Sequence, residues 1–267
     1  MATVSSPTPA APASPPAPGP PTSGRVKDRG SVRHDSVRAT DWTSAGVAKV
    51  LGDVDVSRAD VSGLTSVAGK VRADSFRSQG TLILVGPVDV RGNLELDGTI
   101  HLQSSAHAGS ARADGALRVA GPLTVDRLFS ASGSVEVPSA TVGAIDLVGS
   151  ATIPGVVEAA SVRMRFRDNS HLGTVRGNRV VLHGPAANLV PSLVRSVLGH
   201  EVSVRVDRVE ADTVDLAAVD VEFVHAREIV LGAGAHVTAL EGTVVRRHPT
   251  SRVGPESRSP RPHGLHR

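Results

Sequence analysis

Histidines are the first residues of this chain that suit acid–base chemistry. An imidazole titrates near neutral pH, so it can act as a general base or bind a metal ion. None of the central histidines belongs to an HxxH or HExxH arrangement with a clear third ligand. His183, in "VVLHGPA", is the best candidate for a general base, and the alternative is an exposed residue beside Gly184. The central histidines are His101, His107, His171, His183, His200, His225 and His236.

Carboxylates offer a second kind of chemistry, either calcium binding or acid–base catalysis on a saccharide. The candidates are Asp53, Asp55, Asp89, Glu95 and Asp97. They alternate with apolar residues, which places them on a solvated face rather than around a common centre. We therefore expect no catalytic carboxylate pair, no metal ion and no cofactor.

Composition excludes several other kinds of site. The chain contains no cysteine, so it has neither disulfides nor thiolate ligands. Neither a GxxxxGK[ST] nor a GxGxxG motif is found in a suitable context, so no nucleotide cradle is expected. Hydrophobic residues make up 40% of the chain but aromatic residues only 2%. A core built from Val, Ala, Leu and Ile without large rings indicates a thin interior.

Both ends of the sequence differ from its centre. Residues 1–24 are almost entirely Pro, Ala, Ser, Thr and Gly, and residues 25–40 are polar and basic. The net charge is +3 for residues 1–40 and +5 for residues 246–267, which leaves −5 for the centre out of a total of +3. We predict a disordered tail over residues 1–41, an ordered domain over 42–245 and a disordered Arg- and Pro-rich tail over 246–267.

A nine-residue pattern recurs through the central part of the sequence and indicates how the domain is built. It begins at residues 48, 65, 82, 100, 117, 129, 145 and 180, with a degenerate copy at 162, so most steps are 16–18 residues. Glycine usually holds its fifth place, and we expect these glycines to form one corner of each repeat. They are Gly52, Gly69, Gly86, Gly121, Gly133, Gly149 and Gly184, with Ser104 substituting once.

This short period, combined with apolar residues that alternate within each unit, predicts an all-β fold. Three short strands and their turns use about 17 residues, which is one coil of a single-stranded β-helix solenoid, stacked at about 4.8 Å per coil. About ten coils would give a rod of about 45–50 Å. Stacked inward positions should form one ladder, made of Val50, Val67, Leu84, Leu102, Val119, Leu147 and Leu182.

Two places interrupt the repeat. The step from Leu117 to Phe129 is only 12 residues, so either a coil loses one side or the alignment slips there. The segment "NLVPSLVRSVLG", residues 188–199, has helical apolar spacing and predicts a short inserted helix. That helix either lies on the side of the solenoid or contacts a membrane or partner, and its single charge, Arg195, disfavours strong membrane binding.

The sequence resembles the bactofilins, a family of polymer-forming bacterial cytoskeletal proteins, in particular their longer, multi-coil branch. The resemblance rests on the serial coils from residue 48 to about 160, on "NSHLGTVRGNRVVLHG" (169–184), on the apolar insertion and on the strands of residues 209–242. It implies a right-handed β-helix with disordered tails that polymerises through the helix ends without nucleotide. A protein of this kind is not an enzyme.

The resemblance implies that contacts between subunits lie at the two ends of the ordered domain. The same residues alternatively close the core under capping segments, and both readings remain open. The candidate polymer contacts are Trp42, Val47, Val50, Val54, Val230, Leu231, Val237 and Leu240.

Two other functions remain open. The first is a monomeric scaffold that recruits partners through its side faces and tails. The second is a hexapeptide-type acyltransferase, whose coils are also built from three short strands and which needs a histidine base.

The partners expected for a polymer-forming protein are further copies of the chain. The basic tails suit weak contacts with a protein or an acidic membrane surface, and no specific nucleic-acid binding is expected because they lack aromatic residues. The N-terminus resembles no secretory signal, so we expect a cytoplasmic protein, peripheral to the inner membrane where the tails bind lipid.

Overall fold

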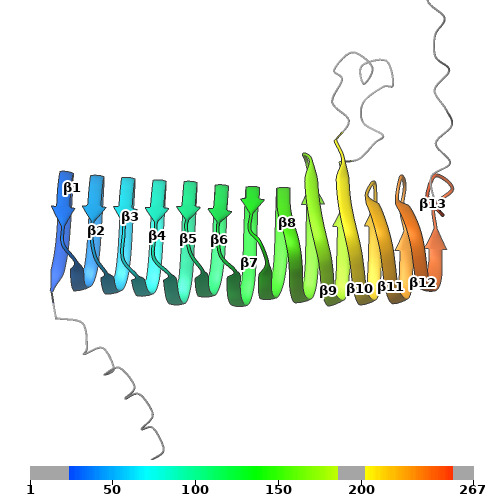
Figure 1. The fold of residues 1–267 in the computed structure, drawn as a ribbon, viewed down its shortest axis with the longest axis horizontal. Coiled ribbons are helices and arrows are strands. Elements are labelled where there is room, and N and C mark those ends of the chain that lie inside the picture. The colour runs from blue at the N-terminus through cyan, green and yellow to red at the C-terminus, as the bar shows by residue number, and fades with distance from the viewer. Residues whose placement is uncertain (1–23, 186–201, 255–267) are drawn as a thin grey trace, which may run out of the picture.

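The computed structural model describes residues 24–185 and 202–254 (Figure 1). These residues form one sheet of 13 parallel strands, stacked in the order of the sequence. The strands are β1 (Arg25–His34), β2 (Val37–Val50), β3 (Val54–Val67), β4 (Val71–Leu84), β5 (Val88–Leu102), β6 (Ala106–Val119), β7 (Leu123–Glu136), β8 (Ala140–Phe166), β9 (Ser170–His183), β10 (Val204–Ala217), β11 (Asp220–Leu231), β12 (His236–Arg247) and β13 (Arg252–Val253).

Each strand winds around the molecule and pairs with the next, so the sheet closes into a rod-shaped β-solenoid (Figure 1). Val37 pairs with Val54, and Val54 with Val71, which confirms the predicted repeat of about 17 residues. The 27-residue strand β8 covers nearly two coils. The rod has more coils than the sequence predicts, and at about 4.8 Å per coil its length is roughly 60 Å.

The core is a narrow column of small side chains with three inward-facing pairs in each coil. We name the three sides of the coil after these pairs: in β2, residues 37–39 form face 1, residues 42–44 face 2 and residues 48–50 face 3. Buried aromatic residues are few, and Trp42, Phe76 and Phe129 all lie on face 2 with at most 1% of their surface exposed. The thin core predicted from composition is confirmed.

The predicted core ladder is correct for its first five members and wrong for the last two. Val50, Val67, Leu84, Leu102 and Val119 pair in register on face 3 and are buried. Leu147 instead pairs with Ala131, and Leu182 pairs with Met164 and Leu216. Those two residues are equally buried but lie on face 2.

The predicted glycine corner divides in the same way, because glycine occupies two different corners of the coil. Gly52, Gly69 and Gly86 stack between faces 3 and 1, and Gly121 approaches Ser104 and Ser105 at that corner. Gly133 and Gly149 lie between faces 2 and 3, where Gly133 pairs with Gly115. Gly184 packs against Ala218. The alignment therefore slipped at the 12-residue step, and no coil loses a side.

The corner between faces 2 and 3 explains why the chain needs so much glycine. From Gly30 to Gly149 each of the first eight coils places a glycine there with positive φ, between 77° and 144°. These glycines pair with one another from coil to coil; they are Gly30, Gly46, Gly63, Gly80, Gly98, Gly115, Gly133 and Gly149. A Cβ on Gly63 would overlap the Gly46 carbonyl oxygen, so no other residue fits at this stacking distance.

The predicted domain boundaries were too narrow at both ends. Residues 25–34 form β1, and residues 246–247 and 252–253 belong to β12 and β13. The polar character of residues 25–40 predicts a tail, but Val26 and Val32 are half-buried against the core. The predicted helix of residues 188–199 lies outside the described residues. Among the described residues, no helix has the length and apolar character needed to cross a membrane.

Candidate functional site

Face 1 presents a column of side chains whose charge alternates from coil to coil. Arg38 pairs with Asp55, Asp55 with Arg72, Arg72 with Asp89 and Asp89 with His107. Opposite charges on neighbouring strands attract, whereas a shift by one coil would bring like charges together. The column therefore favours the observed stacking.

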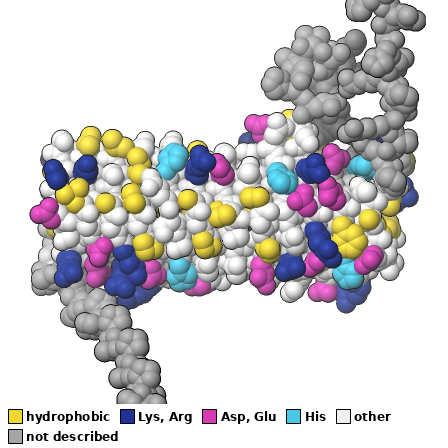
Figure 2. Space-filling view, in the orientation of Figure 1, with side chains coloured by type: hydrophobic (Ala, Val, Ile, Leu, Met, Phe, Trp, Pro, Cys, Tyr) yellow, Lys and Arg dark blue, Asp and Glu magenta, His cyan; other side chains and the backbone are white. Residues whose placement is uncertain are grey.

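Face 2 repeats this arrangement at its own central position. Asp60 pairs with Arg77, Arg77 with Glu95 and Glu95 with Arg112. The Arg77 Nε lies 3.8 Å from a Glu95 carboxylate oxygen. In Figure 2, a row of alternating basic and acidic side chains that contains a histidine, as the face 1 column does, runs along the lower part of the rod over the N-terminal coils.

Three of the five acidic residues singled out from the sequence lie beside cations of neighbouring coils. Asp55, Asp89 and Glu95 belong to the alternating columns, and Asp53 accepts a hydrogen bond from the Lys70 backbone N–H at 2.8 Å. Asp97 pairs with Gln79 and Asp114 along the strands. Among the described residues, no group of three or more His, Asp and Glu side chains has metal-binding geometry.

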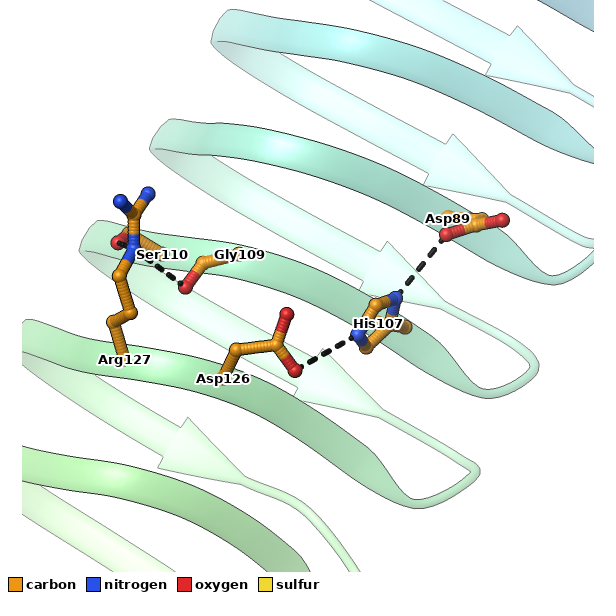
Figure 3. Close-up of polar contacts among 6 residues, drawn as sticks. All are labelled: Asp89, His107, Gly109, Ser110, Asp126 and Arg127. Carbon is orange, nitrogen blue, oxygen red and sulfur yellow. Dashed lines mark hydrogen bonds and ion pairs between the residues drawn. The ribbon is translucent and has the colours of Figure 1, made fainter.

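His107 makes the most elaborate polar contact in the N-terminal coils (Figure 3). Its Nδ1 lies 3.1 Å from an Asp89 carboxylate oxygen, and its Nε2 lies 3.1 Å from one of Asp126. The ring, from β6, thereby bridges carboxylates of β5 and β7. Hydrogen bonding to Asp89, followed by that to Asp126, raises the pKa of His107 above its usual value. Because both ring nitrogens contact carboxylates, the imidazole links three neighbouring coils. It has no free lone pair for catalysis.

His183, which the sequence offers as the best candidate for a general base, lies at the end of β9. Its Nε2 is 3.4 Å from an Asp215 carboxylate oxygen, and 41% of its side chain is exposed. Asp215 pairs in register with Val181, so the contact is again one between stacked coils. The arrangement links strands of neighbouring coils.

The C-terminal coils carry the same alternation on face 1. Glu158 pairs with Arg176, Arg176 with Glu210, Glu210 with His225 and His225 with Glu241. The Arg176 Nε donates to Glu210 at 2.9 Å, and this hydrogen bond lowers the pKa of the Glu210 carboxyl group. His225 Nδ1 lies 3.0 Å from Glu241.

The N-terminal end of the rod is formed by β1. Its Asp28 is only 8% exposed and accepts a hydrogen bond from the Trp42 indole N–H at 2.9 Å. The same carboxylate oxygen lies 2.8 Å from His34 Nε2. β1 is therefore attached to β2 by a buried polar contact as well as by the strand ladder.

The C-terminal end is formed by β12, because β13 pairs only with His236 and Val237. Most of β12 is exposed, including 37% of Val244 and 63% of Val245. The outer edge of residues 238–247 has no further strand among residues 24–185 and 202–254.

Most of the candidate polymer contacts are buried, and those predicted for the C-terminal end lie in the last two long strands, β11 and β12. Trp42 is fully buried beneath β1, Val50 and Val54 are buried in the core, and Val47 is 45% exposed on face 3. Leu231 and Val237 are also buried, Val230 is half-buried in β11, and Leu240 is half-buried in β12. Contacts at the N-terminal end were misplaced because the first coil begins at Arg25.

Sequence reasoning missed the alternating charges, although they are visible in the sequence. Arg38, Asp55, Arg72 and Asp89 each follow one another by 17 residues. The 17-residue spacing that relates the apolar residues and the glycines therefore also relates these charges.

Comparison with protein-family models, with curated proteins and with solved structures finds no match to this chain.

Proposed function

We propose that this protein is a structural, bactofilin-like subunit that assembles end to end into nucleotide-independent filaments. The observation that carries the proposal is the strictly sequential order of the strands, which leaves β1 and β12 at opposite ends of the rod. An open strand edge presents unpaired N–H and C=O groups and is a template for another chain. A second subunit stacked on such an end would continue the same ladder.

Two further features support the proposal. The C-terminal end combines its open edge with the exposed apolar side chains of Val244 and Val245. Cross-coil ion pairs occupy faces 1 and 2, where they hold stacked coils in register. In this proposal the protein acts in the bacterial cytoplasm.

Negative-stain electron microscopy of the full-length protein, without nucleotide and over a range of concentrations, tests this proposal. Filaments are expected for the wild-type protein. Val245→Asp places a charge at the C-terminal end and should shorten or abolish them, because it desolvates a carboxylate in the contact. Leu128→Asp is the matched control: Leu128 is 46% exposed but lies on β7, away from both ends.

Uniform rods of roughly 60 Å from the wild-type protein at every concentration would contradict end-to-end assembly. That result would favour the monomeric scaffold. Circular dichroism of both variants establishes that the β-solenoid is retained.

A further inference from the structure

Face 3 of the N-terminal coils carries exposed apolar side chains where the other faces carry charge. Val47, Leu51, Leu64 and Val85 are exposed by 45%, 37%, 42% and 44%. Ala68 is also exposed, and Ile83 is half-buried. We call these side chains the N-terminal apolar patch; it consists of Val47, Leu51, Leu64, Ala68, Ile83 and Val85.

The patch is continuous because its members lie on stacked coils. Val47 of β2 pairs with Leu64 of β3. Leu51, Ala68 and Val85 each follow a paired core residue of face 3, so they stack along the opposite border of that face. The surface thus extends across three coils on one side of the rod.

The charged side chains in the central outward column of face 3 beside this patch are cations. Its central outward column begins with Arg33 and Lys49, which pair in register, and continues through Ser66 and Ile83. Further along come His101 and Arg118, and the first carboxylate that this column shows among the described residues is Glu136. Within residues 24–185 and 202–254, neither Arg33 nor Lys49 forms an ion pair.

Asp35 and Asp53 lie at the corner of these coils toward face 1. Figure 2 shows the contrast in one view: hydrophobic side chains gather in the upper part of the N-terminal coils together with basic ones, whereas basic and acidic side chains alternate below. The same coils therefore present a neutralised face and an apolar, cationic face.

We propose that the N-terminal apolar patch of face 3 docks on an anionic membrane surface. Exposed apolar side chains beside cations suit a lipid interface, because the apolar groups enter the headgroup region while the cations contact phosphates. Arg33 and Lys49 are the phosphate-contacting residues, and Val47, Leu51, Leu64 and Val85 are the inserting ones. The rod then lies with its long axis along the bilayer.

Charge decides between this partner and a second copy of the chain. A two-fold pairing of patch against patch would bring the Arg33 and Lys49 cations of both copies into one apolar interface, where desolvated like charges repel. Lipid phosphates instead supply the opposite charge. The proposed docking involves a side face, so it does not depend on filament formation through the ends.

Co-sedimentation of the full-length protein with vesicles tests the proposal. One set of vesicles is phosphatidylcholine alone, and the other is an equal mixture of phosphatidylcholine and phosphatidylglycerol. Wild-type protein is expected to bind the mixed vesicles preferentially. The double variant Val47→Asp/Leu64→Asp should bind them about tenfold more weakly, and Lys49→Gln about fivefold.

Leu128→Asp is the matched control, since it places the same charge at an equally exposed leucine away from the patch. It should bind like the wild-type protein, and circular dichroism checks the folding of every variant. Equal binding by the wild-type protein and the double variant would overturn the proposal and assign lipid binding to the tails or another surface. If the double variant lost side-by-side association of rods but kept vesicle binding, the proposal would be overturned, and the patch would be assigned to contacts with a second copy of the chain.

Discussion

The corner between faces 2 and 3 has a different backbone structure in the N-terminal and the C-terminal coils. From Gly30 to Gly149 the corner is a single glycine with positive φ stacked on the glycine of the previous coil. From Phe166 onward the strands are interrupted at this corner instead, at residues 167–169, 218–219 and 232–235. The chain between His183 and Val204, which includes the residues outside the described ranges, leaves and rejoins the solenoid at this same corner.

Side-chain ion pairs, by contrast, join stacked strands in both regions. The C-terminal coils carry His171–Asp207 at 3.2 Å and Arg176–Glu210 at 2.9 Å. The N-terminal coils carry Arg91–Asp74 at 3.2 Å and Arg118–Glu136 at 3.1 Å. The two regions therefore differ in the backbone of the corner rather than in the pairing of side chains.

The largest effect is expected from a side chain on the glycine column. In Gly80→Ala the new Cβ would lie 2.5 Å from the Gly63 carbonyl oxygen, at a φ of 112°. Strain and overlap together should lower the free energy of unfolding by about 3–5 kcal/mol. Chemical denaturation monitored by circular dichroism measures the loss.

Gly234→Ala is the corresponding substitution in the C-terminal coils, and it separates backbone strain from overlap with the neighbouring coil. Gly234 also has positive φ, 70°, but its nearest heavy atom to a new Cβ is the Ala218 Cα at 3.5 Å. Only the left-handed backbone is then penalised, by about 1–2 kcal/mol. Equal losses in the two variants would show that stacking of glycines is not what distinguishes the two regions.

An intermediate effect is expected from Asp28→Ala at the N-terminal end. The substitution leaves the buried Trp42 indole N–H without its acceptor, which should cost about 1–3 kcal/mol. The matching substitution at the other end, Glu241→Ala, removes an exposed partner of His225 and should cost less than about 1 kcal/mol. Hydrogen exchange of β1 and β12 amides measures both, and faster exchange of β1 in Glu241→Ala would contradict this assignment.

The smallest effect concerns pH and the His107 bridge. Because the folded-state pKa of His107 is raised, its stabilising contribution is complete below the unfolded-state pKa of about 6.5 and is lost as pH rises through the folded value. The ring is 43% exposed, so screening limits the contribution to less than about 1 kcal/mol. His107→Gln should therefore destabilise the protein at pH 5.5 but hardly at pH 8.

Urea denaturation of both proteins at these two pH values makes the measurement. The charged groups facing His107 are Asp89 and Asp126, with Arg72 beyond Asp89 in the same column. Asp126→Asn serves as a second variant, since it removes one of the two carboxylates and should reduce the pH dependence. A larger loss at pH 8 than at pH 5.5 would contradict the assigned sign.

The sequence predicted the coil and its period because both depend on local apolar alternation. Val50 to Val119 were placed correctly for this reason, whereas Leu147 was assigned to the wrong face. Glycine appears at two corners, so a glycine-anchored alignment has two possible phases, and Gly121 and Gly133 were matched across them. The first coil was not predicted because β1 is polar. As the end strand it pairs only with β2, so it has fewer buried apolar positions than the inner strands. Its attachment through Asp28 depends on a contact between coils that no local pattern reveals.

The alternating column of face 1 has a consequence for how such a rod can change length. Deleting residues 54–70 would remove one coil and bring Arg38 beside Arg72, two like charges at strand spacing. Deleting residues 54–87 would remove two coils and bring Arg38 beside Asp89, which restores the attraction. The protein therefore has a parity: duplications and deletions in its N-terminal part preserve charge pairing when they come in even numbers of coils, and each such step changes the rod by about 9.6 Å.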